Sequence, residues 1–400
     1  MSKDLPIYVV GAGLGGVAAA LGLARKGWNV RIIEATPELG VIGYGIQLGP
    51  NVFPMFRALG VDEAVRQHAH FPPAVLMLDA LSAKEVVRVP AGESFRARFK
   101  DPYVAIHRVD LHGVLLDAAR AMPNVEILPS TEFASYENLA DRALIRTTDG
   151  RQFEAAAVIA SDGLGSAVRR QMIGEETPRP IGYVAHRTLV PMEQVSKEVG
   201  RDEVILWGGP GFHIVQYPLR NRSLFNIVAV FQTENIYERA DEETYRRVLM
   251  ETYASAHPLM HDMLAMMDLK RRWVIADRDP IRGWSDGRVA LLGDAAHPTL
   301  QSFAQGACMA IEDAVVLAEC IDMTQGDFAR AFKTYERARS LRTARIILES
   351  RSLWEFYHLR GIAAEVRNEA CADRTEDDVF RCLAWIYDGI RMPDVAGASV

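Results

Sequence analysis

Residues 7–16 read IYVVGAGLGG, and this segment decides the fold of the chain. The run from Ile7 to Val10 consists of β-forming apolar residues, which is typical of a strand buried on both faces. The strand leads into Gly11, Gly13 and Gly16, spaced G-x-G-x-x-G. The first glycine permits a tight turn, the second lets the backbone approach a pyrophosphate, and the third lets a helix pack close to the sheet.

A helix and a second strand complete this unit. Residues 17–26 are rich in Ala and Leu and predict a helix that Gly27 ends. The N-terminus of such a helix offers free N–H groups and a positive dipole end to phosphates. Residues 30–33 predict a strand that ends at Glu34, about 20 residues after the glycines, where a carboxylate accepts hydrogen bonds from an adenosine ribose. We therefore predict a dinucleotide site, with NAD and FAD as alternatives.

The composition narrows the class of protein. The 400 residues can form two domains, or one domain with a large insertion, and the contents of 49% hydrophobic and 24% charged residues are ordinary for a globular protein. A net charge of -7 argues against nucleic acid as a partner. No apolar run approaches the roughly 18 residues of a membrane helix. We expect a cytoplasmic protein without a membrane partner, with reduced core thiols at Cys308, Cys320, Cys371 and Cys382.

Two more apolar strands are followed by polar turns. Residues 156–160, AAVIA, lead into Ser161-Asp162-Gly163, and residues 289–292, VALL, lead into Gly293-Asp294. Ligands of open α/β sheets bind at the carboxyl ends of the strands, so we expect both turns and the glycine turn to face one ligand. Arg108 precedes a helix that we predict Asp110 to cap. Arg108 suits a grip on phosphate or ribose, with a surface ion pair as the alternative.

The middle of the chain has a different pattern. Residues 75–78 and 85–89 predict a hairpin, and strands at 184–190, 204–207, 212–218 and 225–231 surround one long helix at 242–267. We interpret this region as an antiparallel substrate domain inserted into the first. The predicted bounds are 1–73, 99–181 and 281–325 for the nucleotide domain, 74–98 and 182–280 for the substrate domain, and 326–400 for a C-terminal helical region that forms a possible homodimer interface.

The order and content of the three turns resemble those of the FAD-dependent aromatic hydroxylases, which are single-component flavoprotein monooxygenases. The segments HRVDLH at 107–112, HIVQYPLR at 213–220 and GDAAHPTLQ at 293–301 carry the resemblance over nearly the whole chain. It implies an α/β fold with a Rossmann-like FAD-binding domain, an inserted antiparallel-sheet domain and C-terminal helices. The FAD-binding residues that it implies are Gly11, Gly13, Leu14, Gly16, Glu34, Ala35, Gln47, Arg108, Asp162, Asp294, Pro298, Gly306 and Ala307.

The resemblance also implies the reaction. NADH reduces FAD, oxygen adds to the flavin at C4a, and a hydroxyl group passes to a small phenolic acid. A phenol reacts far better as phenolate, so the site needs a base, a carboxylate anchor and an apolar shell. His213 suits the base by its ordinary pKa, and Tyr217 shares its face of one strand. We predict catalytic roles for His213, Tyr217 and Gln301, which with Tyr103 also bind the substrate. A histidine and a tyrosine merely packed in the sheet are the alternatives.

Other functions stay open at this point. 3-Hydroxybenzoate, hydroxylated to 2,5-dihydroxybenzoate (gentisate), is the substrate that the resemblance favours. Salicylate and 6-hydroxynicotinate, hydroxylated with loss of CO2, are alternatives. An NAD-dependent dehydrogenase without flavin would use the glycine turn alone, and a non-catalytic flavin protein would bind FAD without turnover. His257 and His261 are four residues apart, but no acid completes a ligand set, so we predict no metal site.

Overall fold

A computed structural model describes residues 5–40, 43–174, 177–234, 241–390 and 392. Its first sheet has six strands in the order β17-β18-β11-β1-β2-β7. All neighbours in it are parallel except the short pair β17 and β18. The strands are β1 (Ile7–Val10), β2 (Val30–Ile33), β7 (Val125–Leu128), β11 (Ala157–Ala160), β17 (Ser285–Asp286) and β18 (Val289–Leu291). Because β1, β11 and β18 are adjacent and parallel, the turns that follow them meet at one edge, as the sequence predicts.

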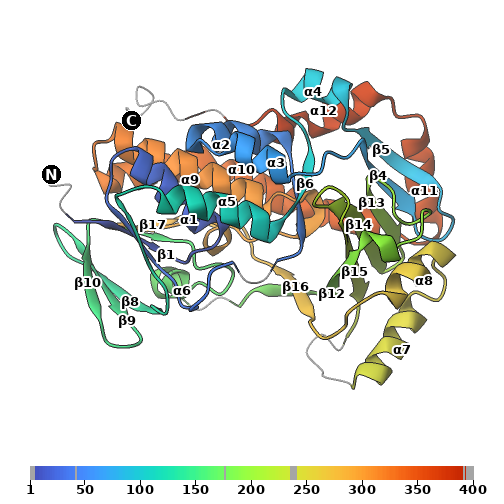
Figure 1. Ribbon diagram of the computed structural model, residues 1–400, viewed down its shortest axis with the longest axis horizontal. Coiled ribbons are helices and arrows are strands. Elements are labelled where there is room, and N and C mark those ends of the chain that lie inside the picture. Colours follow the sequence, from blue (N-terminus) through green and yellow to red (C-terminus); the bar gives the residue numbers. More distant parts are fainter. Residues whose placement is uncertain (1–4, 41–42, 175–176, 235–240, 391, 393–400) are drawn as a thin grey trace.

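Helices cover one face of this sheet (Figure 1). The central helix α1 (Leu14–Arg25) begins directly after the glycine turn and packs between α5 (Arg108–Arg120) and α9 (Gly306–Met323). Small residues allow this approach: a Cβ on Gly22 would lie 3.3 Å from the Cβ of Ala318. The smaller elements around the sheet are β3 (Gly45–Leu48), α2 (Phe53–Leu59), α3 (Asp62–His68), β6 (Val104–His107), β8 (Phe133–Asn138), β9 (Ala143–Thr147), β10 (Gln152–Ala155) and α6 (Ala167–Ile173).

The second sheet has seven strands in the order β16-β12-β15-β14-β13-β4-β5. It is antiparallel except for one parallel pair, β13 and β4. Its strands are β4 (Ala74–Asp79), β5 (Glu85–Pro90), β12 (Arg179–Pro191), β13 (Val204–Gly209), β14 (Phe212–Leu219), β15 (Leu224–Gln232) and β16 (Trp273–Asp277). The predicted hairpin and four predicted strands are confirmed, whereas β16 lies outside the prediction.

The prediction of one long helix at 242–267 is wrong. The segment forms two helices, α7 (Glu242–Thr252) and α8 (Pro258–Ala265), which pack on the outer face of the second sheet. Pro258 starts the second helix, and the His257 side chain caps it by accepting a hydrogen bond from the Leu259 amide. A proline at the first helical position favours a new start over continuation.

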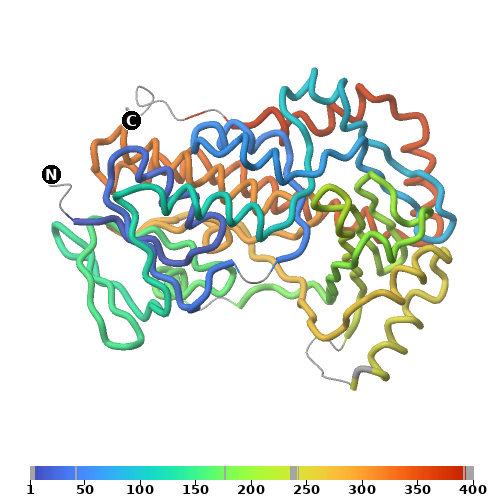
Figure 2. The backbone as a smooth tube through the Cα atoms, in the orientation of Figure 1, coloured from blue at the N-terminus to red at the C-terminus, as the bar shows by residue number. Residues whose placement is uncertain are grey.

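One helix connects the two sheets. The helix α10 (Phe328–Tyr357) has 30 residues and runs from the first sheet to the second (Figure 2). Near its start, the Tyr335 hydroxyl donates to the Leu291 carbonyl of β18. At its other end, the Trp354 and Tyr357 rings contact His213 of β14. After α10 follow α11 (Gly361–Ala372) and α12 (Glu376–Tyr387), and α12 packs on α4 (Glu93–Phe99). The predicted domain bounds stay a prediction, and residues 393–400 of the C-terminal region lie outside the described residues.

Candidate functional site

A cavity of ≈ 990 Å³ lies between the edge of the first sheet and one face of the second. Its wall includes residues from all three predicted turns, among them Gly13, Gly163 and Asp294. The wall continues through the short helix η4 (Gln301–Phe303) to the end of α10. Segments far apart in the sequence therefore surround one space.

The glycine turn has no room for side chains at two positions. Gly11 has a φ of +98°, a conformation that L side chains rarely adopt. A Cβ on Gly16 would lie 2.0 Å from the Gly11 carbonyl oxygen and 2.5 Å from the Ser161 hydroxyl. A Cβ on Gly13, in contrast, would have no heavy atom within 4 Å, because this glycine borders the cavity. The turn thus leaves space on the side where a ligand would approach.

Two helices begin at this cavity. Among the described residues, no side chain caps α1 at Gly13 or α9 at Gln305. Neither helix has an acidic residue in its first turn. Gly13 and Leu14 at one start, and Gly306 and Ala307 at the other, line the cavity. Free amides and the positive dipole end favour anionic groups, which a pyrophosphate and a reduced flavin ring both supply. The donor groups present fit FAD.

Two predicted carboxylates already have partners within the chain. Glu34 Oε2 accepts from the Ala12 amide at 2.8 Å, and Oε1 accepts from the Thr36 amide and hydroxyl. Asp162 accepts from the Ser166 hydroxyl and from the Ala167 and Val168 amides, so it caps α6. Glu34 thereby fixes the glycine turn and still has unused acceptor lone pairs. Asp162 has a mainly structural role, and its neighbours Ser161 and Gly163 line the cavity. The contact of either carboxylate with FAD stays a prediction.

The third turn is held from behind by a buried charge network. Asp313 Oδ2 accepts from the Gly293 amide at 3.1 Å and lies 2.5 Å from His297 Nε2, and Arg339 donates to Asp313 Oδ1 at 2.6 Å. Burial raises the pKa of Asp313, but His297 and Arg339 outweigh it and hold that pKa below its ordinary value. His297 therefore supports the turn.

Asp294 projects from this turn into the cavity. Its side chain is exposed where it borders the cavity, but desolvation by the surrounding protein raises the pKa of its carboxyl, while His297 and Arg108 act to lower it. Arg108, at the start of α5, lines the same space. The predicted cap of α5 is wrong: His107 accepts from the Val109 amide, while Asp110 forms an ion pair with Arg220 at 2.6 Å. Of the other predicted cofactor residues, Gln47 lines the cavity, Pro298 is buried and Ala35 is exposed after β2.

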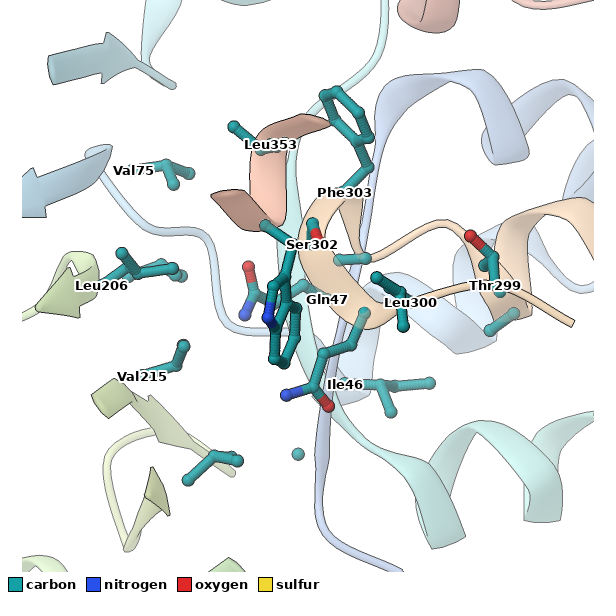
Figure 3. A pocket seen from close by; sticks show the side chains of 18 of the residues that line it. Ile46, Gln47, Val75, Leu206, Val215, Thr299, Leu300, Ser302, Phe303 and Leu353 are labelled. Carbon is teal, nitrogen blue, oxygen red and sulfur yellow. The ribbon is translucent and has the colours of Figure 1, made fainter. Parts of the chain in front are cut away.

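The other end of the cavity is one face of the second sheet. The register pairs Val215 of β14 with Leu206 of β13 on one side and with Val228 of β15 on the other. Opposed residues of neighbouring strands point to the same face, so this row continues from Leu206 to Met77 and from Val228 to Arg187. Figure 3 shows Val75, Leu206 and Val215 on one side of the cavity and Ile46 and Leu300 on the other. The apolar residues of this sheet face are Val75, Met77, Val87, Val89, Val204, Leu206, Val215 and Val228.

Three polar side chains interrupt this apolar face: His213, Tyr217 and Arg187. His213 and Tyr217 lie on β14, as predicted, and burial raises the pKa of Tyr217 to about 12. Arg187 donates to Gln301 Oε1 at 2.9 Å and pairs with no carboxylate in the described part of the chain. The predicted Tyr103 lines the same space, where its hydroxyl donates to Gln47 Oε1 at 2.6 Å.

Sequence reasoning missed two polar residues at this end of the cavity, one on the sheet face and one behind it. Arg187 is a charged residue at an inward-facing position of an otherwise apolar strand. This alternation is visible in the sequence and could have marked it. His358, which follows α10, lies with its Nε2 2.9 Å from Nδ1 of His213. Nothing in the local pattern of a long helix marks such a contact. The expectation of four core thiols is also wrong, since Cys382 is exposed and lines the cavity, while the other cysteines are buried.

The comparisons with known proteins agree with this geometry. The family described as FAD binding domain matches residues 4–350. The chain belongs to the FAD-dependent aromatic hydroxylases. It is 40% identical to 3-hydroxybenzoate 6-hydroxylase of Polaromonas naphthalenivorans over 96% of each chain, and 39% identical to the enzyme of that name from Klebsiella oxytoca over 97% of each. Its fold matches Klebsiella pneumoniae HpxO, solved with FAD and uric acid, with a TM-score of 0.86 at 25% identity, covering 96% of this chain and 97% of that one.

This hydroxylase therefore binds FAD and acts on an aromatic substrate, and a nicotinamide dinucleotide is the reductant typical of its family. A flavin-free dehydrogenase is not supported, since the match to the FAD family covers most of the chain. Within the described ranges, no helix is long and apolar enough to cross a membrane. No group of three or more His, Cys, Asp or Glu side chains among those residues could hold a metal ion.

Proposed function

We propose that this hydroxylase uses NADH and oxygen to convert 3-hydroxybenzoate into 2,5-dihydroxybenzoate. The observation that carries this proposal is the sheet face on which, among the described residues, Arg187, His213 and Tyr217 alone interrupt an apolar surface. An apolar face receives an aromatic ring, a cation receives a carboxylate, and an imidazole with a hydroxyl receives a phenol. The relatives named 3-hydroxybenzoate 6-hydroxylase support the same substrate.

The cofactor end would be held by backbone and by two charged side chains. FAD, once reduced by NADH, supplies the electrophilic oxygen from O2. We assign the glycine turn, with Glu34 behind it, and the start of α1 to the ADP half, and Asp294 to the ribityl hydroxyls. The start of α9 at Gly306 and Ala307 would place a positive dipole end beneath the flavin ring. Arg108 would bind the phosphates or the ribose.

His213 would take the phenolic proton. Its Nδ1 faces His358, so Nε2 is the ring nitrogen left for the substrate, and no other hydrogen bond to this ring exists among described residues. Burial, and then His358, hold the pKa of His213 well below its ordinary value, so the imidazole is unprotonated and able to accept at neutral pH. Tyr217, with a pKa of about 12, stays protonated and would donate a hydrogen bond that orients the phenolate.

Arg187 would bind the substrate carboxylate. Burial lowers the pKa of its guanidinium, but an arginine starts far enough above neutrality to remain charged. Gln301 accepts from Arg187 and thereby aims it, and the amide group of Gln301 remains as a second donor. A cation enclosed with one neutral partner is stabilised by an incoming anion, which favours acids over neutral phenols.

The test is a panel of phenolic acids with NADH, in which oxygen uptake is recorded and products are identified. Formation of 2,5-dihydroxybenzoate from 3-hydroxybenzoate, coupled to NADH oxidation, is the expected result. Loss of CO2 from salicylate or 6-hydroxynicotinate, without turnover of 3-hydroxybenzoate, would replace the substrate assignment. A homodimer through the C-terminal helices stays a prediction.

A further inference from the structure

The second histidine beside the sheet is a group that the mechanism above leaves unused. His358 Nε2 lies 2.9 Å from His213 Nδ1, and the two residues are 6% and 1% exposed. The rings of Trp354 and Tyr183 pack against His358. Two imidazole nitrogens at this distance share one hydrogen, because one must donate and the other must accept.

The role of His213 fixes which nitrogen carries that hydrogen. This step rests on the proposed function, in which His213 Nε2 accepts the phenolic proton and is bare beforehand. A neutral imidazole with a bare Nε2 carries its hydrogen on Nδ1. His213 Nδ1–H then donates to His358 Nε2, and His358 carries its own hydrogen on Nδ1. In both rings the N–H group is therefore on Nδ1, the nitrogen farther along the path from the cavity.

The outer ring is buried but lies two residues before an exposed segment. His358 Nδ1 is buried and makes no well-aligned hydrogen bond within the described part of the chain, although the Trp354 carbonyl, four residues earlier, acts on this ring as an acceptor. Two residues later, the exposed Arg360 donates to Gln232 Oε1 at 2.8 Å, beside the turn that joins β13 to β14. A Cβ on Gly211 of that turn would lie 2.7 Å from Arg360 Nη2. A buried N–H with only a poorly aligned acceptor costs free energy, so a water molecule at Nδ1 is favoured.

We propose that His358 acts through His213 as the outer member of a proton relay that connects the phenol to solvent. The phenol O–H bond breaks as the proton joins His213 Nε2. The His213 Nδ1–H bond breaks as a proton joins His358 Nε2, and the His358 Nδ1 proton passes to water. Both rings are neutral before and after, with their hydrogens exchanged between nitrogens. The same path in reverse returns a proton for the product and restores the first arrangement.

The surroundings favour passage of the proton over its storage. Burial lowers the pKa of His358 to about 4; the Trp354 carbonyl acts to raise this pKa, and the Arg360 cation acts to lower it. The titratable side chains around the pair are Tyr183 and Tyr357, whose pKa values burial raises, and Tyr253, whose hydroxyl donates to the His213 carbonyl. Glu355 acts electrostatically on Tyr183, whose ring packs against His358. No carboxylate in the described residues contacts either ring to trap an imidazolium.

The test follows the proton and the ligand separately. The FAD-loaded protein, without NADH, is mixed rapidly with 3-hydroxy-4-nitrobenzoate, whose phenolate absorbs visible light, in weak buffer containing a pH indicator. In wild type, phenolate formation and proton release should share one rate. In His358→Gln the amide oxygen can still accept from His213 Nδ1 but cannot pass a proton on. We expect proton release to slow by about tenfold or more, with added imidazole restoring it.

His186→Gln is the matched control. His186 is a fully buried histidine of β12 that points to the opposite face of the sheet and contacts the Arg271 carbonyl and the Tyr245 hydroxyl. This variant should keep the wild-type rates. Proton release at the wild-type rate in His358→Gln, with ligand ionised, overturns the relay alone. A wild type that ionises no phenolic acid overturns the proposed function and the relay together.

A second measurement needs no variant. In mixtures of H2O and D2O, two protons that move in one step give a curved dependence of the ionisation rate on the deuterium fraction. A single transfer gives a straight line. Curvature in wild type supports the relay, and a straight line contradicts it even if His358→Gln fails to fold.

Discussion

The two ends of the cavity are built from different parts of the chain. The end that we assign to the cofactor consists mainly of backbone, namely the turns after three parallel strands and the starts of α1 and α9, with Asp294 and Arg108 as its charged side chains. The substrate end consists of side chains on a sheet face, where the register selects which residues point inward. At Gly16 of the first end, a side chain would disturb packing that the fold needs, because none fits there. A change at the second end alters what the cavity binds while the sheet stays intact.

The largest expected effect contrasts two glycines of the same turn. Gly16→Ala places a methyl group against the Gly11 carbonyl and should lower the free energy of unfolding by about 3 kcal/mol, with loss of FAD. Gly13→Ala meets no protein atom within 4 Å, so it should fold normally and weaken FAD binding by about tenfold. Urea denaturation and flavin fluorescence separate the two. Equal stability of both variants would show that the turn is less tightly packed than described.

At the substrate end, His213→Ala should spare the fold and remove the base. Hydroxylation should fall by about 100-fold, the magnitude usual for loss of a general base, while FAD stays bound. Product formation and NADH oxidation are measured together, because with an unreactive phenol NADH is oxidised without formation of the hydroxylated product. Unchanged turnover and coupling would mean that another group accepts the proton.

Arg187→Met should raise KM for 3-hydroxybenzoate by roughly 30-fold, since a charge-assisted hydrogen bond is worth about 2 kcal/mol. The neutral analogue 3-hydroxybenzamide is the control, because it has no carboxylate to lose. The variant should bind acid and amide about equally. If it still prefers the acid as strongly as wild type, the carboxylate anchor lies elsewhere.

The smallest expected effect is a slope of stability with pH. The pKa values of buried His186 and His358 are each lowered to about 4, so the unfolded chain, with a pKa near 6.5, binds more protons than the folded one. The free energy of unfolding should therefore fall as pH drops from about 6.5 to 4, by up to about 1.4 kcal/mol per pH unit for each histidine. Denaturation at several pH values checks this. His186→Gln should flatten the slope, and an unchanged slope would assign it to other groups.

The same contrast explains what the sequence could predict. Backbone features carry their own signature in glycines and apolar runs, so the three turns and their convergence were predictable. Side-chain partners depend on distant segments. Asp110 resembles a helix cap, but Arg220, far along the chain, takes its carboxylate. His358 meets His213 only because α10 is long enough to reach the second sheet. The strands β10 and β11 belong to different sheets although only Ala156 separates them, and no local pattern reveals this division.

The strand order also has a consequence for biosynthesis. The central pair β1 and β11 is joined by β18 only when residues 289–291 have left the ribosome, and β4 must wait for β13. Neither sheet is complete in a nascent chain that lacks the last third of the sequence. The start of α9, which closes the cofactor end, emerges later still. We therefore expect the flavin to be taken up late in translation or afterwards, and a chain truncated before α9 to lack part of the end that we assign to it.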